Sequence, residues 1–354
     1  MGRREERNAE IQQYVIENLR AHGQDIAALV AGRFGISRQA AARHLQRLRD
    51  EGLVFVSGKT RSSQYELLPV KNLTFTYEIG EKTQEDRVWR QDVMPALAGL
   101  RDNVVTICQY GLTEMLNNAL EHSEGEQVTV RVELWPDLVQ MGVLDDGVGI
   151  FEKIQRDLHL DDPLHALLEL SKGKLSTDPQ HHTGEGIFFT SRAFDAFTIT
   201  SHQVYFVHRE TGLDFVFEKK DVCDGTDVQM EIRRSSERTL KSAFDSYSVD
   251  GSFGFDRTVA PVFLAQYGNE KLVSRSQARR LLARLDRFKV VLLDFDKVDY
   301  IGQAFADEIF RVFQQEHPEV QLLWANESDE VRGMIARARG GLSAAAAGSN
   351  GQRS

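Results

Sequence analysis

The sequence predicts an α/β (α+β) protein made of three successive modules. Short apolar-patterned helices and a hairpin fill the N-terminal part, the middle combines one long amphipathic helix with alternating apolar runs, and strands alternate with helices towards the C-terminus. Hydrophobic residues make up 41% of the 354 residues, which is enough to fill more than one core. We expect module boundaries at 1–70, 71–240 and 250–340, followed by a disordered tail at 341–354.

The first module is predicted to contain three helices and a hairpin. Apolar residues recur at helical spacing in three stretches, 10–22, 26–33 and 38–51. Ser37 is a suitable N-cap for the third of these helices. Two alternating runs, 53–56 and 64–68, flank a tip that carries basic residues. This order of elements, with the sequence from Ile36 to Val54, resembles a winged helix-turn-helix domain.

The resemblance implies DNA binding through the third helix and the hairpin tip. Gln39 and Arg43 are expected to read base edges in the major groove, with Arg38 and Arg47 on phosphates. At the hairpin tip, Lys59 and Arg61 are expected to follow the DNA backbone. Residues 1–70 carry 11 Lys+Arg against 8 Asp+Glu, so their net charge of +3 contrasts with −13 for the rest of the chain. Such folds also serve as protein-docking modules, and this modest charge leaves that alternative open.

The middle module is centred on the stretch from Gly111 to His122. Its apolar residues recur at three- and four-residue steps, which predicts a helix with one buried stripe. Glu114, Asn118 and His122 fall four residues apart and therefore share a second face. A carboxylate, a carboxamide and an imidazole in one row can hold a hard cation such as magnesium with its water. An ordinary solvated polar face is the alternative for this stretch taken alone.

Three glycine-containing boxes follow this helix. Asp145-Asp-Gly-Val-Gly149 comes after an apolar strand, Gly184-Glu-Gly186 precedes an apolar-patterned helix, and Gly225-Thr-Asp227 opens a further strand. Together with Glu-x-x-x-Asn on the preceding helix, they resemble the GHKL ATP-binding domain, which gyrase, the Hsp90 chaperone, histidine kinases and MutL share. The four motifs stand in the family's order, whereas one Asp-Gly alone would be an ordinary turn.

The resemblance implies an Mg-ATP site and a role for each matching residue. Asn118 corresponds to the magnesium-bridging Asn, and Glu114 to the Glu that orients or deprotonates the attacking water in hydrolysing members. Asp145 corresponds to the Asp that accepts a hydrogen bond from the adenine amino group, and Thr226 to a hydroxyl near that contact. ATP and Mg²⁺ are therefore the expected cofactors. His122 stands where histidine kinases often carry a His, although a hydrogen-bonded structural role explains it equally well.

Glycines at four positions fit the same site. Gly147 and Gly149 are expected to let the backbone pass close to the base and ribose, where a Cβ would clash. Gly184 and Gly186 are expected to begin a helix whose free N–H groups face the triphosphate.

Residues 151–183 lie between two of the boxes, where the GHKL family has its ATP lid. The segment is charged and holds four histidines whose spacings match no zinc pattern, so we expect a mobile, solvated lid. Lys172 and Lys174 are candidates to reach a γ-phosphate, with ordinary surface lysines as the alternative. Five alternating runs are expected to complete a mixed sheet with helices on one face: 128–134, 197–201, 204–208, 213–218 and 228–232.

Strand–helix alternation beyond residue 250 predicts a small α/β domain. Strands are expected at 290–295 and 320–324, and helices at 275–288, 302–316 and 328–337. The stretch from Leu293 to Ile309 resembles STAS-like domains related to anti-sigma-factor antagonists. Antagonists carry a phosphorylatable Ser in the loop before the helix, but residues 301–304 hold no hydroxyl beyond the nearby Tyr300. Phosphorylation by the usual route is therefore not expected.

These resemblances predict an Mg-ATP-binding cytoplasmic regulator, a DNA-binding transcriptional regulator gated by ATP binding or slow hydrolysis. Cys108 and Cys223 are the only cysteines, and apolar runs fall short of the roughly 20 residues that cross a bilayer, so we expect a reducing cytoplasm and no membrane. No helical hairpin with a phosphoacceptor His precedes Gly111, which argues against autokinase activity. Two alternatives stay open, a protein Ser/Thr kinase of the anti-sigma-factor type acting on a STAS partner and a non-catalytic nucleotide-binding scaffold. A protein partner at the STAS-like domain and a homodimer are both compatible with the sequence.

Overall fold

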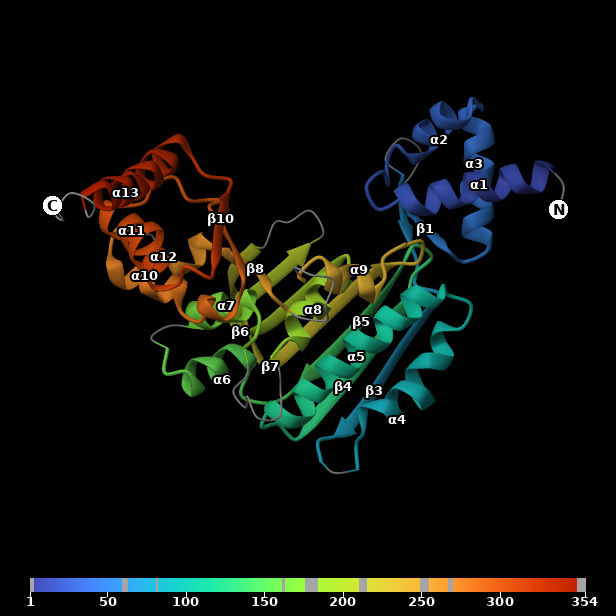
Figure 1. Ribbon diagram of the computed structural model, residues 1–354. Coiled ribbons are helices and arrows are strands. Elements are labelled where there is room, and N and C mark those ends of the chain that lie inside the picture. Colours follow the sequence, from blue (N-terminus) through green and yellow to red (C-terminus); the bar gives the residue numbers. More distant parts are fainter. Residues whose placement is uncertain are drawn as a thin grey trace.

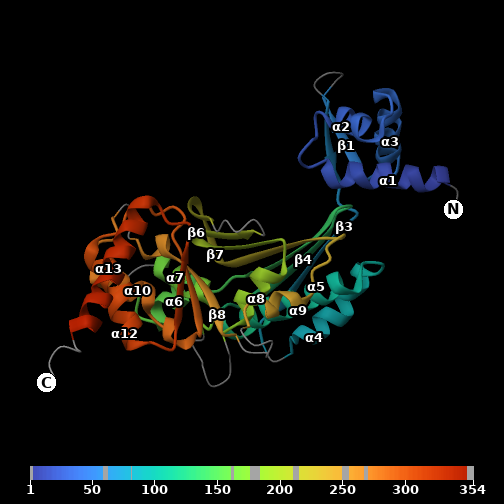
Figure 2. The ribbon, with the colours of Figure 1, turned by 45° about the horizontal axis from the view of Figure 1, so that its top comes forward.

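A computed structural model describes residues 3–58, 63–80, 82–160, 163–175, 184–209, 215–248, 255–266 and 270–348. It confirms a mixed α/β chain. The N-terminal helices stand at one end of a central sheet, and the C-terminal α/β part packs near the other end (Figure 1; Figure 2). Buried hydrophobic side chains gather in two cores. One belongs to the N-terminal module, and the other continues from the central into the C-terminal module.

The N-terminal module has three helices and a two-stranded antiparallel sheet. Its elements are α1 (Arg3–Asn18), α2 (Ile26–Phe34), α3 (Arg38–Asp50), β1 (Val54–Ser57) and β2 (Gln64–Leu67). Helix α1 begins seven residues before the predicted start at residue 10. Ser37 caps α3 as predicted, because its Oγ accepts a hydrogen bond from Ala40 N at 3.1 Å. The helices enclose a small core that includes Val15, Ile26 and Leu45.

The N-terminal module is attached to the turn between two strands of the central sheet. Arg20, just beyond α1, pairs with Asp137 through Nε and Oδ2 at 2.5 Å. The same guanidinium lies over the Trp135 ring, 4.8 Å from its centroid, and Trp135 packs against the N-terminal core. Val70 N donates to Leu134 O at 2.6 Å, which ties the connecting segment to the sheet.

The central sheet has five strands in the order β3-β4-β5-β7-β6. Their bounds are β3 (Lys71–Glu78), β4 (Gln127–Leu134), β5 (Leu138–Asp145), β6 (Ala196–Arg209) and β7 (Phe215–Arg233). Every neighbouring pair is antiparallel, so the prediction of a mixed sheet was wrong. The physical reason is that four of the expected runs join into the two long strands β6 and β7, which pair directly with each other.

Helices cover one face of this sheet, as predicted. They are α4 (Glu85–Val88), which continues through a π turn (Trp89–Val93) and a 3₁₀ turn (Met94–Leu97), then α5 (Asp102–His122), α8 (Gly186–Ala193) and α9 (Leu240–Asp245). Helix α5 presses its apolar stripe against the sheet, with Leu112, Met115 and Leu116 buried. At Gly111 a Cβ would collide with the Phe194 ring, so only glycine permits this close packing of α5.

The described part of the segment between the glycine boxes contains two helices. They are α6 (Ile150–Asp157) and α7 (Pro163–Lys172). The prediction of a solvated lid was wrong for α7, because Ala166, Leu167 and Leu168 are completely buried. These side chains belong to the core shared with the C-terminal module, a long-range contact that the charged local sequence does not reveal. Residues 176–183 lie outside the described residues.

The C-terminal module contains a three-stranded parallel sheet in the order β10-β9-β8. The strands are β8 (Arg257–Pro261), β9 (Val290–Asp294) and β10 (Gln321–Ala325), of which β8 was not predicted. The helices are α10 (Arg275–Leu282), α11 (Gln303–Asp307), which continues through a π turn (Glu308–Phe313) into α12 (Gln314–Glu316), and α13 (Asp329–Gly348). Helix α13 extends over residues 341–348, where we expected disorder; the run Ala344–Ala347 favours helix. Residues 349–354 lie outside the described part.

Candidate functional site

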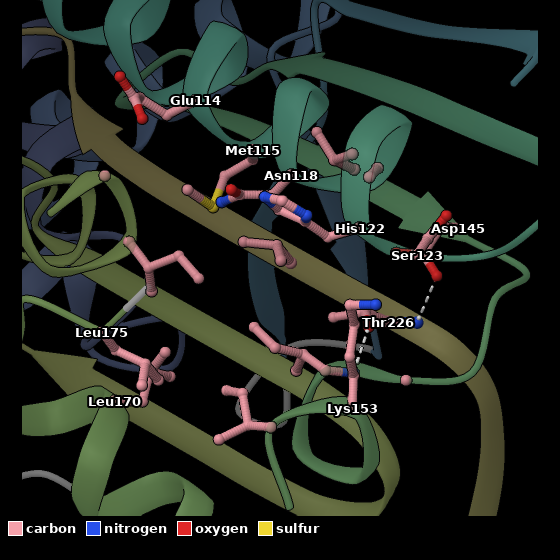
Figure 3. Close-up of a pocket in the computed structure, with 18 of the residues that line it drawn as sticks. Glu114, Met115, Asn118, His122, Ser123, Asp145, Lys153, Leu170, Leu175 and Thr226 are labelled. Atoms are coloured by element: carbon pink, nitrogen blue, oxygen red, sulfur yellow. Dashed lines mark hydrogen bonds between the residues drawn. The ribbon is translucent and has the colours of Figure 1, made fainter. Parts of the chain in front are cut away.

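A pocket lies between α5 and the place where the end of β5 meets the middle of β7, and α6, α7 and α8 form its other walls. It gathers residues from all four motifs. Figure 3 shows Glu114 and Asp145 at opposite ends, with Asn118 and His122 between them on α5 and Leu170 and Leu175 facing them across the space. Segments more than a hundred residues apart in the sequence thus meet in one pocket.

Asp145 ends β5 with a buried carboxylate, 6% exposed. Its Oδ1 accepts hydrogen bonds from Gly147 N at 3.0 Å and Thr226 N at 3.2 Å. Burial raises the pKa of Asp145, and these two backbone N–H groups oppose the rise. Because both bonds go to Oδ1, the second carboxylate oxygen is left to accept a hydrogen from a ligand in the pocket.

Thr226 lies opposite Asp145 on β7 and links two of the boxes. Its Oγ1 accepts a hydrogen bond from Ile150 N at 3.0 Å, which leaves the hydroxyl hydrogen available as a donor. The preceding Gly225 has a φ of +75°, and a Cβ there would collide with the carbonyl oxygen of Asp145. Glycine at 225 therefore allows β7 to approach β5 closely enough for the Asp145–Thr226 bond.

The two glycines of the Asp-x-Gly-x-Gly box have different surroundings. Gly149 lines the pocket, and its φ of +84° is a conformation that favours glycine. Gly147 does not line the pocket. A Cβ on Gly147 would collide with the carbonyl oxygen of Ser123, at the end of α5. Gly147 thus allows the box to pack against α5, and the expectation that it approaches a base or ribose stays a prediction.

Glu114, Asn118 and His122 all line the pocket from successive turns of α5. Asn118 Nδ2 is buried and has no hydrogen-bond partner among the residues that the structure describes. A buried carboxamide group without a partner is costly, because desolvation of a polar atom is then uncompensated. A ligand or an ordered ion with its water would remove that cost.

The N-terminal end of α8 forms the pocket wall beside Glu114. Gly184 and Gly186 both line the pocket, and a Cβ on Gly186 would collide with Glu114 Oε2. Gly184 has a φ of +68°, and a Cβ there would collide with the backbone of Leu175. The first backbone N–H groups of α8 have no partners within the helix, and a helix N-terminus attracts anions.

Lys153 on α6 is a pocket residue that the sequence reasoning missed. Its Nζ lies 2.7 Å from Glu124 Oε1 and 3.9 Å from Asp157 Oδ2, and the side chain is 17% exposed. Ile150, Lys153 and Ile154 all line the pocket. Their spacing of three and four residues after the Asp-x-Gly-x-Gly box predicts one helix face, which could have identified Lys153 from the sequence. Lys153 supplies a cation to the pocket.

Lys172 and Lys174, the two candidates for a γ-phosphate contact, point towards the C-terminal module. Lys172 is 1% exposed and pairs with Glu169 at 2.7 Å. Lys174 Nζ donates to Arg287 O at 3.0 Å and lies over the Phe288 ring. Both the proposed γ-phosphate role and the surface alternative were therefore wrong for Lys172 in this structure. Its ammonium group is used at an internal interface.

Apolar side chains complete the pocket wall: Met115, Val143, Ile150, Ile154, Leu170, Leu175, Ile187, Phe188 and Val228. The pocket thus combines an apolar lining with a few directed polar groups, as small-molecule sites usually do. Among the described residues, no three His, Cys, Asp or Glu side chains cluster as a metal site.

The second predicted site is the exposed face of α3. Arg38, Gln39, Arg43 and Arg47 all project into solvent, whereas Leu45 and Leu48 face the core. Burial lowers the pKa of His44, and the neighbouring Arg47 and Arg43 lower it further, which reflects a positive local field. Lys59 and Arg61 lie outside the described residues.

Residues 277–332 match the family model of a STAS-like domain of unknown function (DUF4325), which confirms the STAS-like prediction for this part of the chain. A comparison with curated proteins finds no match. The loop before α11 is packed: Gly302 N donates to Leu272 O at 2.7 Å, and Ile301 pairs with Leu272. None of the helices in the described residues is long and apolar enough to span a membrane.

Proposed function

We propose that the chain is an Mg-ATP-binding regulator whose N-terminal module binds DNA. The single observation that carries this proposal is the pocket that brings together a buried carboxylate, a helix N-terminus and a carboxamide group whose buried Nδ2 has no partner among the described residues. In this reading, residues 71–240 form a GHKL-type domain and residues 1–70 a winged helix-turn-helix. Both assignments rest on the motif order and on the elements described above.

The residues present fit the expected ligand. Asp145 offers one carboxylate oxygen to an amino group at its end of the pocket, and apolar residues such as Val143 and Ile154 suit a flat base. At the other end, the N-terminus of α8 suits a phosphate chain, whereas Lys153 lies towards the Asp145 end, beside Thr226 (Figure 3). A purine nucleotide with an exocyclic amino group satisfies these demands together.

Asn118 fits a magnesium ion that arrives with the phosphates through its Oδ1, and its buried Nδ2, a hydrogen-bond donor, suits a phosphate or water oxygen. Magnesium commonly takes one or two protein oxygens and completes its shell with phosphate and water oxygens. A site without three clustered carboxylates or histidines in the described chain is compatible with that preference. When bound, the ion neutralises phosphate charge and can polarise the terminal phosphate.

Glu114 is placed to act on a water beside the terminal phosphate. Its carboxylate lies against Gly186 at the N-terminus of α8, where the phosphate chain is expected to end. A carboxylate in that place can accept a proton from an attacking water or simply orient it. Slow hydrolysis is therefore part of the proposal, in addition to binding.

A structural connection supports coupling between the pocket and the DNA-binding module. Strand β5 begins at Leu138 and ends at Asp145 in the pocket. Its start follows the Trp135–Asp137 turn, where Arg20 pairs with Asp137 and lies over the Trp135 ring. A displacement of β5 on nucleotide binding can thus reach the end of α1 through the Asp137–Arg20 ion pair and the Arg20–Trp135 contact. We propose that nucleotide binding alters the position of the N-terminal module and with it the affinity for DNA.

The binding claim is tested by titrating the full chain with trinitrophenyl-ATP in the presence of magnesium. In Asp145→Asn the amide group keeps an oxygen for Gly147 N and Thr226 N, but its NH₂ then opposes the ligand's amino group. Loss of a hydrogen bond to a charged acceptor costs about 1.5–3 kcal/mol, so affinity should fall at least about tenfold. Asp146→Asn is the matched control, because Asp146 caps a loop outside the pocket. Equal affinity in wild type and Asp145→Asn contradicts the assignment.

A further inference from the structure

Helix α7 is shared between the pocket and the STAS-like domain. Leu170 on α7 and Leu175 just beyond it line the pocket. Glu169 and Lys172, on the same two turns, are 4% and 1% exposed and contact residues of the C-terminal module. A single short helix therefore has one side in the candidate nucleotide site and another in a different domain.

A buried charge cluster holds α7 to the C-terminal module. Lys172 Nζ lies 2.7 Å from Glu169 Oε1 and donates to the carbonyl oxygens of Arg280 at 3.3 Å and Ala283 at 3.0 Å. Arg284 pairs with the other carboxylate oxygen of Glu169. Burial lowers the pKa of Lys172 to about 8, although Glu169 opposes the shift. One carboxylate thus balances two cations on opposite sides of the domain boundary, the buried Lys172 and the partly exposed Arg284.

Further contacts fix the backbone that follows the charge cluster. Thr258 Oγ1 on β8 donates to Lys172 O at 2.6 Å. Beside it, Phe255 packs against Phe188 of α8, with ring centroids 4.5 Å apart, and against Phe288 at 5.2 Å. Phe188 also lines the pocket. The C-terminal module therefore contacts α7 and α8, two helices that form walls of the pocket.

We infer that the STAS-like domain controls nucleotide affinity by holding α7 in place as a wall of the pocket. The inference rests on the proposed function, since it names the regulation of that same site. If α7 separates from the STAS-like domain, Leu170 and Leu175 move away from the pocket wall with it. The pocket then loses apolar contact with its ligand. Because coupling between two sites is reciprocal, a bound nucleotide must in turn stabilise the contact between α7 and the STAS-like domain. Any partner that pulls on the STAS-like domain would then lower nucleotide affinity.

Glu169→Gln in the full chain tests this inference. The change keeps the side-chain shape but leaves the buried Lys172 and the partly exposed Arg284 without their carboxylate, which favours release of α7. We expect faster amide hydrogen exchange over residues 163–175. We also expect trinitrophenyl-ATP affinity to fall about fivefold or more, the lower end of typical coupling between sites. Glu330→Gln, an exposed glutamate on α13, is the matched control and should change neither quantity.

A second variant distinguishes a specific effect on α7 from general unfolding of the protein. Arg284→Met removes the C-terminal partner of Glu169 but leaves a neutral Glu169–Lys172 pair, so it should produce the same two effects at smaller size. Faster exchange in α7 with unchanged nucleotide affinity in both variants would overturn the coupling. Unchanged exchange would overturn the role of the cluster. If the wild type binds no trinitrophenyl-ATP, the proposed function fails and this inference fails with it. If the wild type binds trinitrophenyl-ATP and only the variants depart from the expected affinities, the result concerns the role of α7 and leaves the proposed function intact.

Discussion

Asp145 and Thr226 are cross-strand partners at the end of the β5–β7 pair, and their bond joins two motifs that lie far apart in the sequence. Thr226 N donates to Asp145 Oδ1 at 3.2 Å, while Thr226 Oγ1 accepts from Ile150 N at 3.0 Å. The carboxylate, the strand end and the start of α6 are thereby fixed to one another. This fixed arrangement presents the remaining oxygen of Asp145 in one direction, as a binding site requires.

Replacement of Asn118 by Leu should abolish the magnesium dependence of nucleotide binding. The leucine fills the space but removes Oδ1, the expected oxygen ligand of the ion, together with the buried Nδ2, which has no hydrogen-bond partner among the described residues. Wild type should bind trinitrophenyl-ATP about tenfold more tightly with magnesium than with a chelator, whereas Asn118→Leu should show no such difference. Asn117→Leu, a neighbour that does not line the pocket, is the control. A magnesium effect of wild-type size in Asn118→Leu would exclude this residue from the ion site.

Glu114→Gln should separate binding from turnover. The amide group cannot accept a proton from water, so phosphate release should fall by about a hundredfold, the lower end of typical general-base contributions. Nucleotide affinity should stay within about twofold of wild type, because Glu114 lies away from the Asp145 end of the pocket. Phosphate release measured beside a binding titration tests this, with Glu126→Gln as control. Unchanged release in Glu114→Gln would remove its catalytic role.

Arg43→Ala should weaken DNA binding through the exposed face of α3. Loss of an arginine that reads a base edge costs about 1–3 kcal/mol, and loss of a phosphate contact lowers the salt dependence. The measurement is fluorescence anisotropy with duplex DNA at about 50 mM salt and at higher salt. Lys82→Ala removes an exposed cation in the central module and should leave affinity unchanged. If wild type shows no salt-dependent DNA binding, the protein-docking alternative for this module gains support.

Arg20→Ala should uncouple the two modules while leaving each of them active. The change removes both the ion pair with Asp137 and the contact over Trp135. Intrinsic DNA affinity and nucleotide affinity should stay close to wild type, but the effect of Mg-ATP on DNA affinity should shrink. Arg4→Ala, on the exposed part of the neighbouring α1, is the control. A full nucleotide effect in Arg20→Ala would mean that coupling takes another route.

Sequence patterns predicted those parts of the fold that neighbouring residues determine, such as helices and their caps. Apolar steps of three and four residues identified α5, and the Ser37 cap identified the start of α3. The row formed by Glu114, Asn118 and His122 followed from helical geometry alone, and all three residues do line one pocket. The functional meaning of that pocket stays a proposal, because the motifs that suggest it are a resemblance.

Long-range packing produced the differences from the sequence predictions. Helix α7 looks solvated in a charged segment, yet Ala166, Leu167 and Leu168 are buried because the C-terminal module covers them. Lys172 was a candidate for a phosphate contact, with an ordinary surface lysine as the alternative, whereas its buried ammonium group donates to the carbonyl oxygens of Arg280 and Ala283. A partner supplied more than a hundred residues later in the chain cannot be read from the local sequence.

The measurement that tests the account most directly is DNA affinity of the full chain with and without Mg-ATP, for wild type and Asp145→Asn. The account predicts a wild-type affinity that changes about fivefold or more when Mg-ATP is added, and no change in Asp145→Asn. Asp146→Asn should behave as wild type. Equal DNA affinity of the wild type with and without Mg-ATP, under conditions where trinitrophenyl-ATP binds, would contradict the proposal that nucleotide governs DNA binding.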